Sequence, residues 1–227
     1  MFLEKNIDVL GIGNAIIDVI ANADDAFLEN HNLNKGSMTL VDETISKNIY
    51  AEMKNKVQMS GGSAANTIFG LSELGCKSAF IGKRSDDELG NIFHSDLVNS
   101  NIIFTTSPLD TGAASARCLI LVTSDAERTM ATFLGSSSKL TLTDINEEQI
   151  ASSKIVYLEG YLFDPPEAQE AFQKAAEYAR AHNAKVAFTL SDAFCVERHR
   201  KKMKYFIENH VDILFSNEGE IKSLYET

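Results

Sequence analysis

The sequence predicts an α/β protein, a doubly wound parallel sheet with a small second β-sheet beside it. Three observations lead to this prediction: short apolar runs rich in β-branched residues, amphipathic helices that alternate with them, and two β-rich segments that interrupt the alternation. Alternating strands and helices form a parallel sheet covered on both faces, because each helix carries the chain back before the next parallel strand begins. With 227 residues, 44% of them hydrophobic, the chain can bury a core of this kind.

The expected strands of the main sheet are short apolar runs. The first, IDVLGIG at 7–13, is β-branched and ends in glycine, as buried parallel strands often do. Four more strands are expected at 77–83, 153–163, 184–191 and 211–217.

The expected helices follow these strands with helical spacing of apolar residues. The helix at 87–100 has Leu89, Phe93 and Leu97 four residues apart. The helix at 165–183 has prolines at its entry, where a missing N–H costs little. Two further helices are expected, one after the two glycines of MSGGSAANTIFGLSELG at 59–75 and one at 195–210.

Two β-rich segments break the alternation, at about 15–45 and 101–135. In the second, SARCLILV and RTMATFL flank the turn SDAE, which predicts a β-hairpin. We therefore expect a main domain made of residues 1–14, 46–100 and 136–227, and a β-sheet lid made of residues 15–45 and 101–135.

The charge distribution argues against a nucleic-acid or anionic membrane surface, since phosphate binding needs clustered Lys or Arg. The formal net charge is -11 at pH 7, and the densest basic run, HRKKMK at 199–204, lies in an expected helix as a solvated face. The N-terminus has neither a signal-peptide layout nor a long apolar span, which predicts a cytoplasmic protein. The three cysteines lack C-x-x-C spacing and are expected to be reduced and buried.

The sequence lacks several familiar ligand-binding motifs. GIGNAI at 11–16 lacks the third glycine of a dinucleotide-binding loop, because Ile16 stands in its place. No G-x-x-x-x-G-K-[ST] loop is found, and the five histidines have no metal-ligand spacing, so no direct metal ligand is predicted.

Small polar residues gather where expected strands end. Asn14 and Asp18 follow the first strand, and the helix after the first β-rich segment opens with four residues of interest: Gly61, Gly62, Ser63 and Asn66. Ligands of doubly wound sheets bind beyond the carboxyl ends of the strands, so these residues are expected to form one site. Carboxylates and amides bind hydroxyls, and glycines allow close backbone approach, so the set suits a polyol. In the alternative interpretation, each residue has only a local structural role: Ser63 is a helix N-cap, Asn66 an exposed first-turn residue and Asp18 a turn residue.

Four segments occur in an order typical of one kinase family: GIGNAIIDV, SGGSAANTIFGLSELG, GKRSDDELG and SNEGE. Through them the chain resembles the ribokinase-like (PfkB) carbohydrate and nucleoside kinases over its whole length. It is most similar to bacterial adenosine kinases, on the strength of GNAIIDVIA, EGYLFDPPEA and TLSDAFCVERHR. It departs from the family at Arg84 and Ser85, where members more often have small or apolar residues.

The resemblance implies a ribokinase-like sheet with a β-sheet lid and an acceptor site for the 5'-hydroxyl of adenosine or a related nucleoside or sugar. Asp18, Gly62 and Asn66 would hydrogen-bond ribose hydroxyls. Gly61 would allow backbone approach, and Asn14 and Ser63 would lie beside the acceptor.

The resemblance also implies ATP and Mg²⁺ as cofactors. Asn217 and Glu220, the N-x-x-E motif, would organise magnesium and phosphate, and an aromatic residue within 161–163 would stack on a base. A homodimer through the lid or an exposed sheet edge is the implied assembly.

The family's catalytic base lies in a later G-A-G-D segment that these residues do not contain, so no catalytic residue is predicted and the sheet is expected to be truncated at its C-terminal end. The expected function is an ATP-dependent phosphotransferase that is crippled in this form. The alternative is a non-catalytic protein that binds a nucleoside or sugar. A nicotinamide-dependent oxidoreductase is disfavoured by Ile16.

Overall fold

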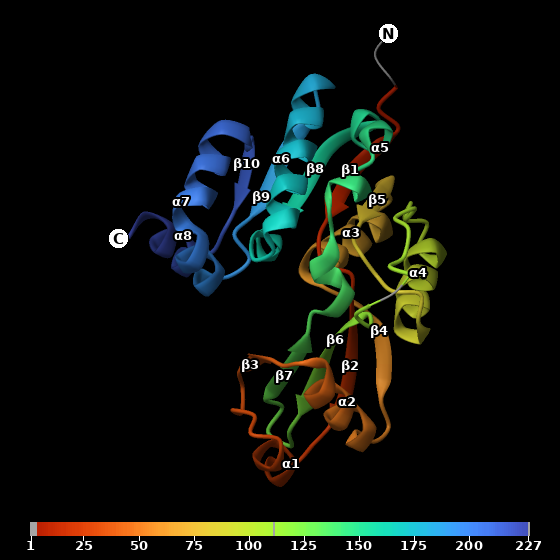
Figure 1. Ribbon diagram of the computed structural model, residues 1–227, viewed down its shortest axis with the longest axis vertical. Coiled ribbons are helices and arrows are strands. Elements are labelled where there is room, and N and C mark those ends of the chain that lie inside the picture. Colours follow the sequence, from red (N-terminus) through yellow and green to blue (C-terminus); the bar gives the residue numbers. More distant parts are fainter. Residues whose placement is uncertain (1–3, 111, 227) are drawn as a thin grey trace.

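The computed structural model describes residues 4–110 and 112–226 and contains two five-stranded sheets (Figure 1). The main sheet has the strand order β10-β9-β8-β1-β5, and all of its strand pairs are parallel. The second sheet has the order β3-β7-β6-β2-β4 and mixes parallel and antiparallel pairs. The predicted fold class, an α/β protein with a parallel sheet and a smaller second sheet, is confirmed.

The strands of the main sheet lie where the apolar runs predicted them. They are β1 (Ile7–Ile12), β5 (Ser78–Ile81), β8 (Ser153–Glu159), β9 (Lys185–Thr189) and β10 (Ile213–Phe215). The one clear difference is that the expected strand 153–163 ends at Glu159 and continues as the 3₁₀ helix η3 (Gly160–Phe163). A Cβ at Gly160 would lie only 2.6 Å from the carbonyl oxygen of Thr189, so a residue without a side chain is needed where the chain turns against β9.

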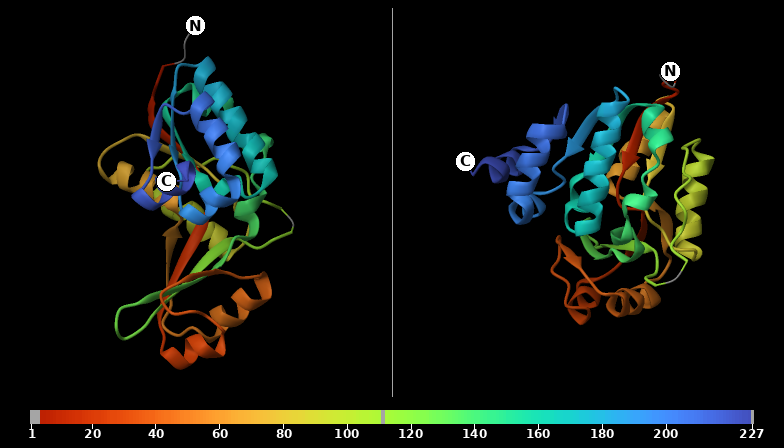
Figure 2. Two further views of the ribbon diagram at one scale, coloured as in Figure 1. Left: turned by 90° about the vertical axis from the view of Figure 1, so that its left-hand side faces the viewer. Right: turned by 45° about the horizontal axis from the view of Figure 1, so that its top comes forward.

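Helices cover both faces of the main sheet. They are α3 (Ser63–Glu73), α4 (Glu88–Asn99), α5 (Glu147–Ala151), α6 (Pro166–Ala181), α7 (Ala193–His210) and α8 (Glu218–Tyr225), with 3₁₀ helices η1 (Gly135–Lys139) and η2 (Leu142–Asp144). Figure 2 shows α6 and α7 on one side of the sheet and α3 on the other. Local signals start two of these helices: the carboxylate of Asp87 accepts from Gly90 N at the start of α4, and that of Asp192 accepts from Cys195 N at the start of α7.

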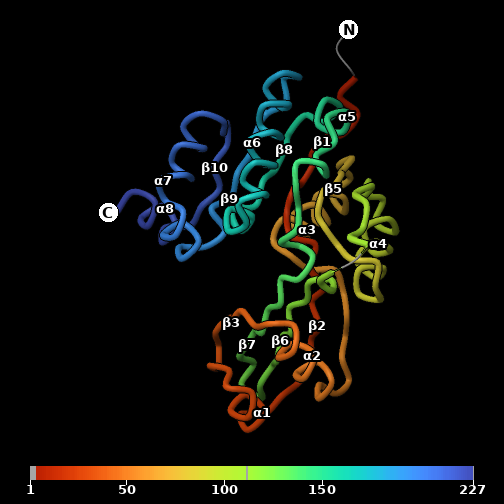
Figure 3. The backbone as a smooth tube through the Cα atoms, viewed as in Figure 1, coloured from red at the N-terminus to blue at the C-terminus, as the bar shows by residue number. Residues whose placement is uncertain are grey.

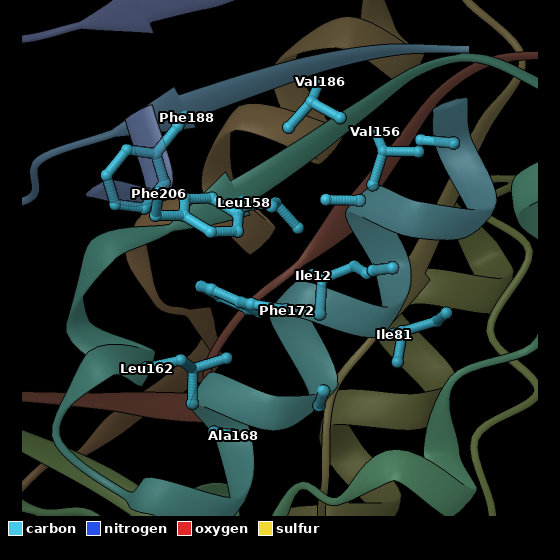
Figure 4. Close-up of a cluster of buried hydrophobic side chains, with 14 of the residues drawn as sticks. Ile12, Ile81, Val156, Leu158, Leu162, Ala168, Phe172, Val186, Phe188 and Phe206 are labelled. Carbon is cyan, nitrogen blue, oxygen red and sulfur yellow. The ribbon is translucent and has the colours of Figure 1, made fainter. Parts of the chain in front are cut away.

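The core under α6 and α7 is aromatic. Phe172 of α6 is completely buried and packs with Phe163, Phe188 and Phe206, whose rings lie 5.6–5.7 Å from one another in edge-on or tilted arrangements. Figure 4 shows Phe172, Phe188 and Phe206 among apolar side chains of β1 and β8 such as Ile12 and Leu158. Alternate residues of each strand point toward this core, and so do residues of α6 that are three or four positions apart. These two periodicities bring the core side chains together.

The second sheet contains β2 (Ile16–Asn22), β3 (Met38–Leu40), β4 (Val57–Gly61), β6 (Ala116–Val122) and β7 (Arg128–Phe133). The predicted hairpin is β6–β7, which pair antiparallel. Helices α1 (Asp25–Asn30) and α2 (Glu43–Glu52) lie between its strands along the chain, and α2 packs against β6 and β7. Four apolar side chains of this sheet are 43–55% exposed: Met38, Leu40, Val57 and Met59.

The expected division of the chain placed residues 46–100 with the main sheet, whereas the second sheet extends to Gly61. Strand β4 pairs antiparallel with β2, from Ile16 opposite Gly61 to Ile20 opposite Val57. Strand β4 is therefore the edge strand of the second sheet, next to β2.

The chain passes between the two sheets at four connections: β1 to β2, β4 to α3, α4 to β6, and β7 to η1. Figure 3 shows the first of these as the red tube that leaves β1 and enters β2. The carboxyl end of β1 therefore faces the start of the second sheet. Among the described residues, no helix is both long and apolar enough to span a bilayer.

Replacing Phe172 with alanine should lower the free energy of unfolding by about 3–5 kcal/mol, because it opens a cavity at the centre of the aromatic core. Urea denaturation followed by circular dichroism measures this. Tyr205→Ala, on a side chain that is 65% exposed, is the matched control and should change the value by less than about 0.5 kcal/mol. Equal effects for the two variants would contradict the packing described here.

Candidate functional site

Asn14 and Gly62 meet where two connections cross between the sheets. Asn14 follows β1, is only 4% exposed, and lies beside Gly62, the residue that precedes α3. Gly62 has φ = 94°, a conformation that favours glycine, and a Cβ there would lie 2.7 Å from the carbonyl oxygen of Asn14. The glycine is therefore required both for its backbone conformation and for the close approach of the two connections.

Asp18 lies on β2 with its carboxyl group over the backbone of Gly61. A Cβ at Gly61 would overlap that carboxyl group, so these two sequence-predicted residues are brought into contact. Burial raises the pKa of Asp18 to about 6. Within the described part of the chain its carboxylate makes no hydrogen bond and no ion pair, so nothing in the protein compensates for the desolvation. Asp18 is a strand residue, which excludes its alternative interpretation as a turn residue.

The start of α3 lies at the same junction. Its N-cap is Gly62, which has no side chain to satisfy the first backbone N–H groups. Ser63 is the first helical residue, not the cap, and its local interpretation as an N-cap is wrong. Ser63 and Asn66 are both exposed and one turn apart, so they share a face. No described residue bonds the Asn66 side chain, although its backbone N–H donates to Gly62 O at 2.9 Å.

The structure adds a residue to this group, Glu159, at the carboxyl end of β8. Its side chain is buried, with 1% exposure, and accepts from Asn14 Nδ2 at 2.7 Å, Asn14 N at 3.4 Å and Ala64 N at 2.8 Å. Burial raises the pKa of Glu159, and the three N–H donors oppose the rise. Since all three partners are donors, the geometry matches the ionised carboxylate.

Glu159 thus caps α3 from another element, in place of the side chain that Gly62 lacks. Sequence reasoning missed it, although a signal was present. An acidic residue that ends a buried apolar strand is as unusual as the asparagine after the first strand, and both strands end at the same edge of the sheet.

Asn217 and Glu220 lie farther along that edge. They form the capping box of α8: Glu220 N donates to Asn217 Oδ1 at 2.8 Å, while Asn217 N and Nδ2 donate to the Glu220 carboxylate at 3.0 and 2.9 Å. Asn217 follows β10, which is three strand positions from β1, or about 14 Å at the usual strand spacing. The structure therefore places these two residues together, apart from the group around Asn14.

At most one side chain of the segment 161–163 is accessible for stacking on a base. Phe163 and Leu162 are buried in the core and are excluded as stacking residues. Tyr161 is half-buried, and its hydroxyl donates to Ser191 O at 3.4 Å, beyond the end of β9. Phe194, in the first turn of α7, is 73% exposed in the segment that follows the same strand.

Chemically, the junction combines a carboxylate without a partner among the described residues, an oriented amide and a helix start whose Ala64 N–H is bound by Glu159. The carboxylate and the amide oxygen can accept hydrogen bonds from hydroxyls. Across residues 4–110 and 112–226, no cluster of three or more His, Cys, Asp or Glu side chains is arranged to hold a metal ion.

The curated proteins that resemble this chain include two whose names describe kinases of small molecules. The chain is 30% identical over 226 residues to a guanosine-inosine kinase of Escherichia coli (strain K12), covering 95% of this chain and 52% of the relative. It is 29% identical over 190 residues to a 5-dehydro-2-deoxygluconokinase of Bacillus licheniformis, covering 82% and 52%. The chain spans about half the length of these curated relatives.

Solved structures that resemble this chain are also named as kinases of small molecules. An adenosine kinase from Sinorhizobium meliloti superposes with a TM-score of 0.89 and 45% identity, covering 98% of this chain and 68% of that one. A probable sugar kinase from Rhizobium etli gives a TM-score of 0.89 and 39% identity, with the same coverages. The family described as "pfkB family carbohydrate kinase" matches residues 7–227. The chain therefore belongs to the pfkB family of carbohydrate kinases.

Proposed function

We propose that this chain is part of an ATP-dependent kinase that phosphorylates the 5'-hydroxyl of a nucleoside, with adenosine or a related purine nucleoside as the acceptor. The observation that carries the proposal is the Asp18 carboxylate, which lies against Gly61 just before the start of α3 and has no hydrogen-bond or ion-pair partner among the described residues. A buried, unpaired carboxylate costs stability, and a ligand that donates hydroxyl protons to it removes that cost.

In this proposal Asp18 and Asn14 bind the ribose hydroxyls, and Asn66 reaches the same hydroxyls from the first turn of α3. Gly61 and Gly62 keep the backbone free of side chains where the sugar lies. Ser63 lies beside the acceptor. These assignments account for the polar residues that the local fold does not employ.

A nucleoside is favoured over a free sugar by two aromatic side chains at the same edge. Tyr161 follows β8 and Phe194 follows β9, and Phe194 is too exposed to contribute to the core. A flat base buries its faces against such rings. The names of the relatives agree in part, since two of them act on nucleosides and two on sugars or their derivatives.

The second sheet would act as a lid over the acceptor. Its apolar side chains at Met38, Leu40, Val57 and Met59 are exposed as the structure stands. Closure would exclude water, which competes with the acceptor hydroxyl for the phosphoryl group.

ATP and Mg²⁺ would bind toward the β10 end of the edge. When bound, they supply the phosphoryl group and neutralise its charge. Each oxygen of Glu220 uses one lone pair in the capping box, which leaves lone pairs for water ligands of magnesium. Asn217 and Glu220 therefore fit an organising role that acts through water.

The first test is calorimetric titration of adenosine, guanosine, inosine and ribose into the purified 227-residue chain. We expect saturable binding of at least one purine nucleoside, weaker binding of ribose, and about a tenfold loss of affinity in Asn66→Ala, because one hydroxyl hydrogen bond disappears. Asn99→Ala, an exposed asparagine at the end of α4, is the matched control and should bind normally.

A folded chain that binds ribose as tightly as any nucleoside would contradict the nucleoside assignment. Adding ATP and Mg²⁺ to the same samples separates a phosphotransferase from a protein that only binds its ligand. Nucleoside 5'-monophosphate, detected by chromatography, identifies the first, and binding without product identifies the second.

Replacing Asp18 with asparagine should stabilise the chain and weaken ligand binding at once. The folded-state pKa of Asp18, about 6, exceeds its ordinary value of 3.8, so the folded chain binds more protons between these pH values. The carboxylate therefore lowers stability as the pH rises through this window and keeps it lowered above pH 6. Asp18→Asn should raise the free energy of unfolding by about 1–3 kcal/mol at pH 8 and change it little at pH 3.5. Denaturant titrations at both pH values measure this, and equal effects at both would contradict it.

A further inference from the structure

The Glu159 carboxylate determines which atom of Asn14 faces the ligand. An asparagine amide has one donor end and one acceptor end. Its donor, Nδ2, lies 2.7 Å from Glu159 Oε1, and an ionised carboxylate can only accept. The acceptor, Asn14 Oδ1, is therefore directed away from Glu159, and no described residue donates to it.

The orientation is locked because Glu159 cannot change its own hydrogen-bonding character without losing a partner. Its second oxygen accepts from Ala64 N at 2.8 Å, and the Asn14 backbone N–H adds a third donor. A proton or an amide N–H on either oxygen would confront one of these donors. The carboxyl group is buried, so water does not replace a lost bond.

We propose that Glu159 is a positioning residue that sets the hydrogen-bonding polarity of the acceptor pocket. By holding the Asn14 amide in one orientation, it makes Asn14 an acceptor toward the ligand, as Asp18 is by its own chemistry. Two acceptors at one site select a ligand that offers two hydroxyl donors, and they reject an ether or carbonyl oxygen at the same place. This inference rests on the proposed function in taking the ligand to be a nucleoside.

The test is Glu159→Gln, which keeps the size of the side chain and changes one oxygen to an NH₂ donor. With the NH₂ toward Asn14, the amide of Asn14 must turn and present Nδ2 to the pocket. We expect the affinity for the preferred ribonucleoside to fall about tenfold to a hundredfold. We also expect the variant to lose most of its discrimination against one mono-O-methyl nucleoside, the one methylated at the hydroxyl that faces Asn14.

If Glu159 only caps α3, the Glu159→Gln variant should lose affinity equally for all nucleoside analogues. That result would overturn the proposal. A double-mutant cycle of Asn14→Ala and Glu159→Gln gives a second check. Once the Asn14 side-chain amide is removed, Glu159→Gln should have little further effect on the affinity for the nucleoside. Asp212→Asn is the matched control, since its carboxylate also accepts a backbone N–H, from Val186 at 2.8 Å, but at the opposite edge of the main sheet. It should leave affinity and discrimination unchanged.

A measurement without ligand keeps the proposal separate from the proposed function. The side-chain NH₂ of Asn14, assigned in ¹⁵N spectra by its loss in Asn14→Ala, should exchange slowly with water in the parent chain and rapidly in Glu159→Gln. If the parent chain binds no nucleoside but shows this protection, the nucleoside assignment fails while the positioning of Asn14 stands. Rapid exchange in the parent chain would overturn the proposal whether or not a nucleoside binds.

Discussion

The hydrogen bonds to Glu159 connect the three elements on which the rest of the site depends. The carboxylate belongs to β8, and its donors come from the connection after β1 and from the first turn of α3. Without it, α3 would begin at a glycine with unpaired N–H groups, and the amide of Asn14 would have no preferred orientation. The dense backbone packing at Gly13, Gly62 and Gly82 follows from the same constraint, because a Cβ at any of them would meet a neighbouring backbone or side-chain atom within 2.7 Å.

A half-buried carboxylate, Asp18, and a buried one, Glu159, lie close to this junction, and their hydrogen-bond partners differ. Burial raises the pKa of both Asp18 and Glu159. Glu159 receives three N–H donors, so its desolvation is partly compensated within the protein. Asp18 receives none from the described residues. A carboxylate kept buried without compensation is expected where a ligand supplies the missing partners, whereas a compensated one is expected where it holds structure in place.

The relatives share the frame and differ in the names of their acceptors, which include a guanosine-inosine kinase, an adenosine kinase and a kinase of a dehydro-sugar acid. A shared fold does not fix the substrate, which depends on the side chains of the site. Beyond the ends of β8 and β9, Tyr161 is half-buried and Phe194 is 73% exposed. Phe163, two residues after Tyr161, is buried in the core.

The sequence by itself determined the alternation of strands and helices, the hairpin β6–β7 and most element bounds, because apolar periodicity, proline and capping residues act over a few neighbouring residues. It also predicted Asn14, Asp18 and the glycines before α3 as site residues, since polar residues and glycines that follow a buried apolar run stand out locally. Only the tertiary structure decided that β4 joins the second sheet and that Glu159 orients Asn14. These are contacts between residues far apart in the chain, up to 145 positions for Glu159 and Asn14, and no local pattern encodes which partners the fold brings within hydrogen-bond distance.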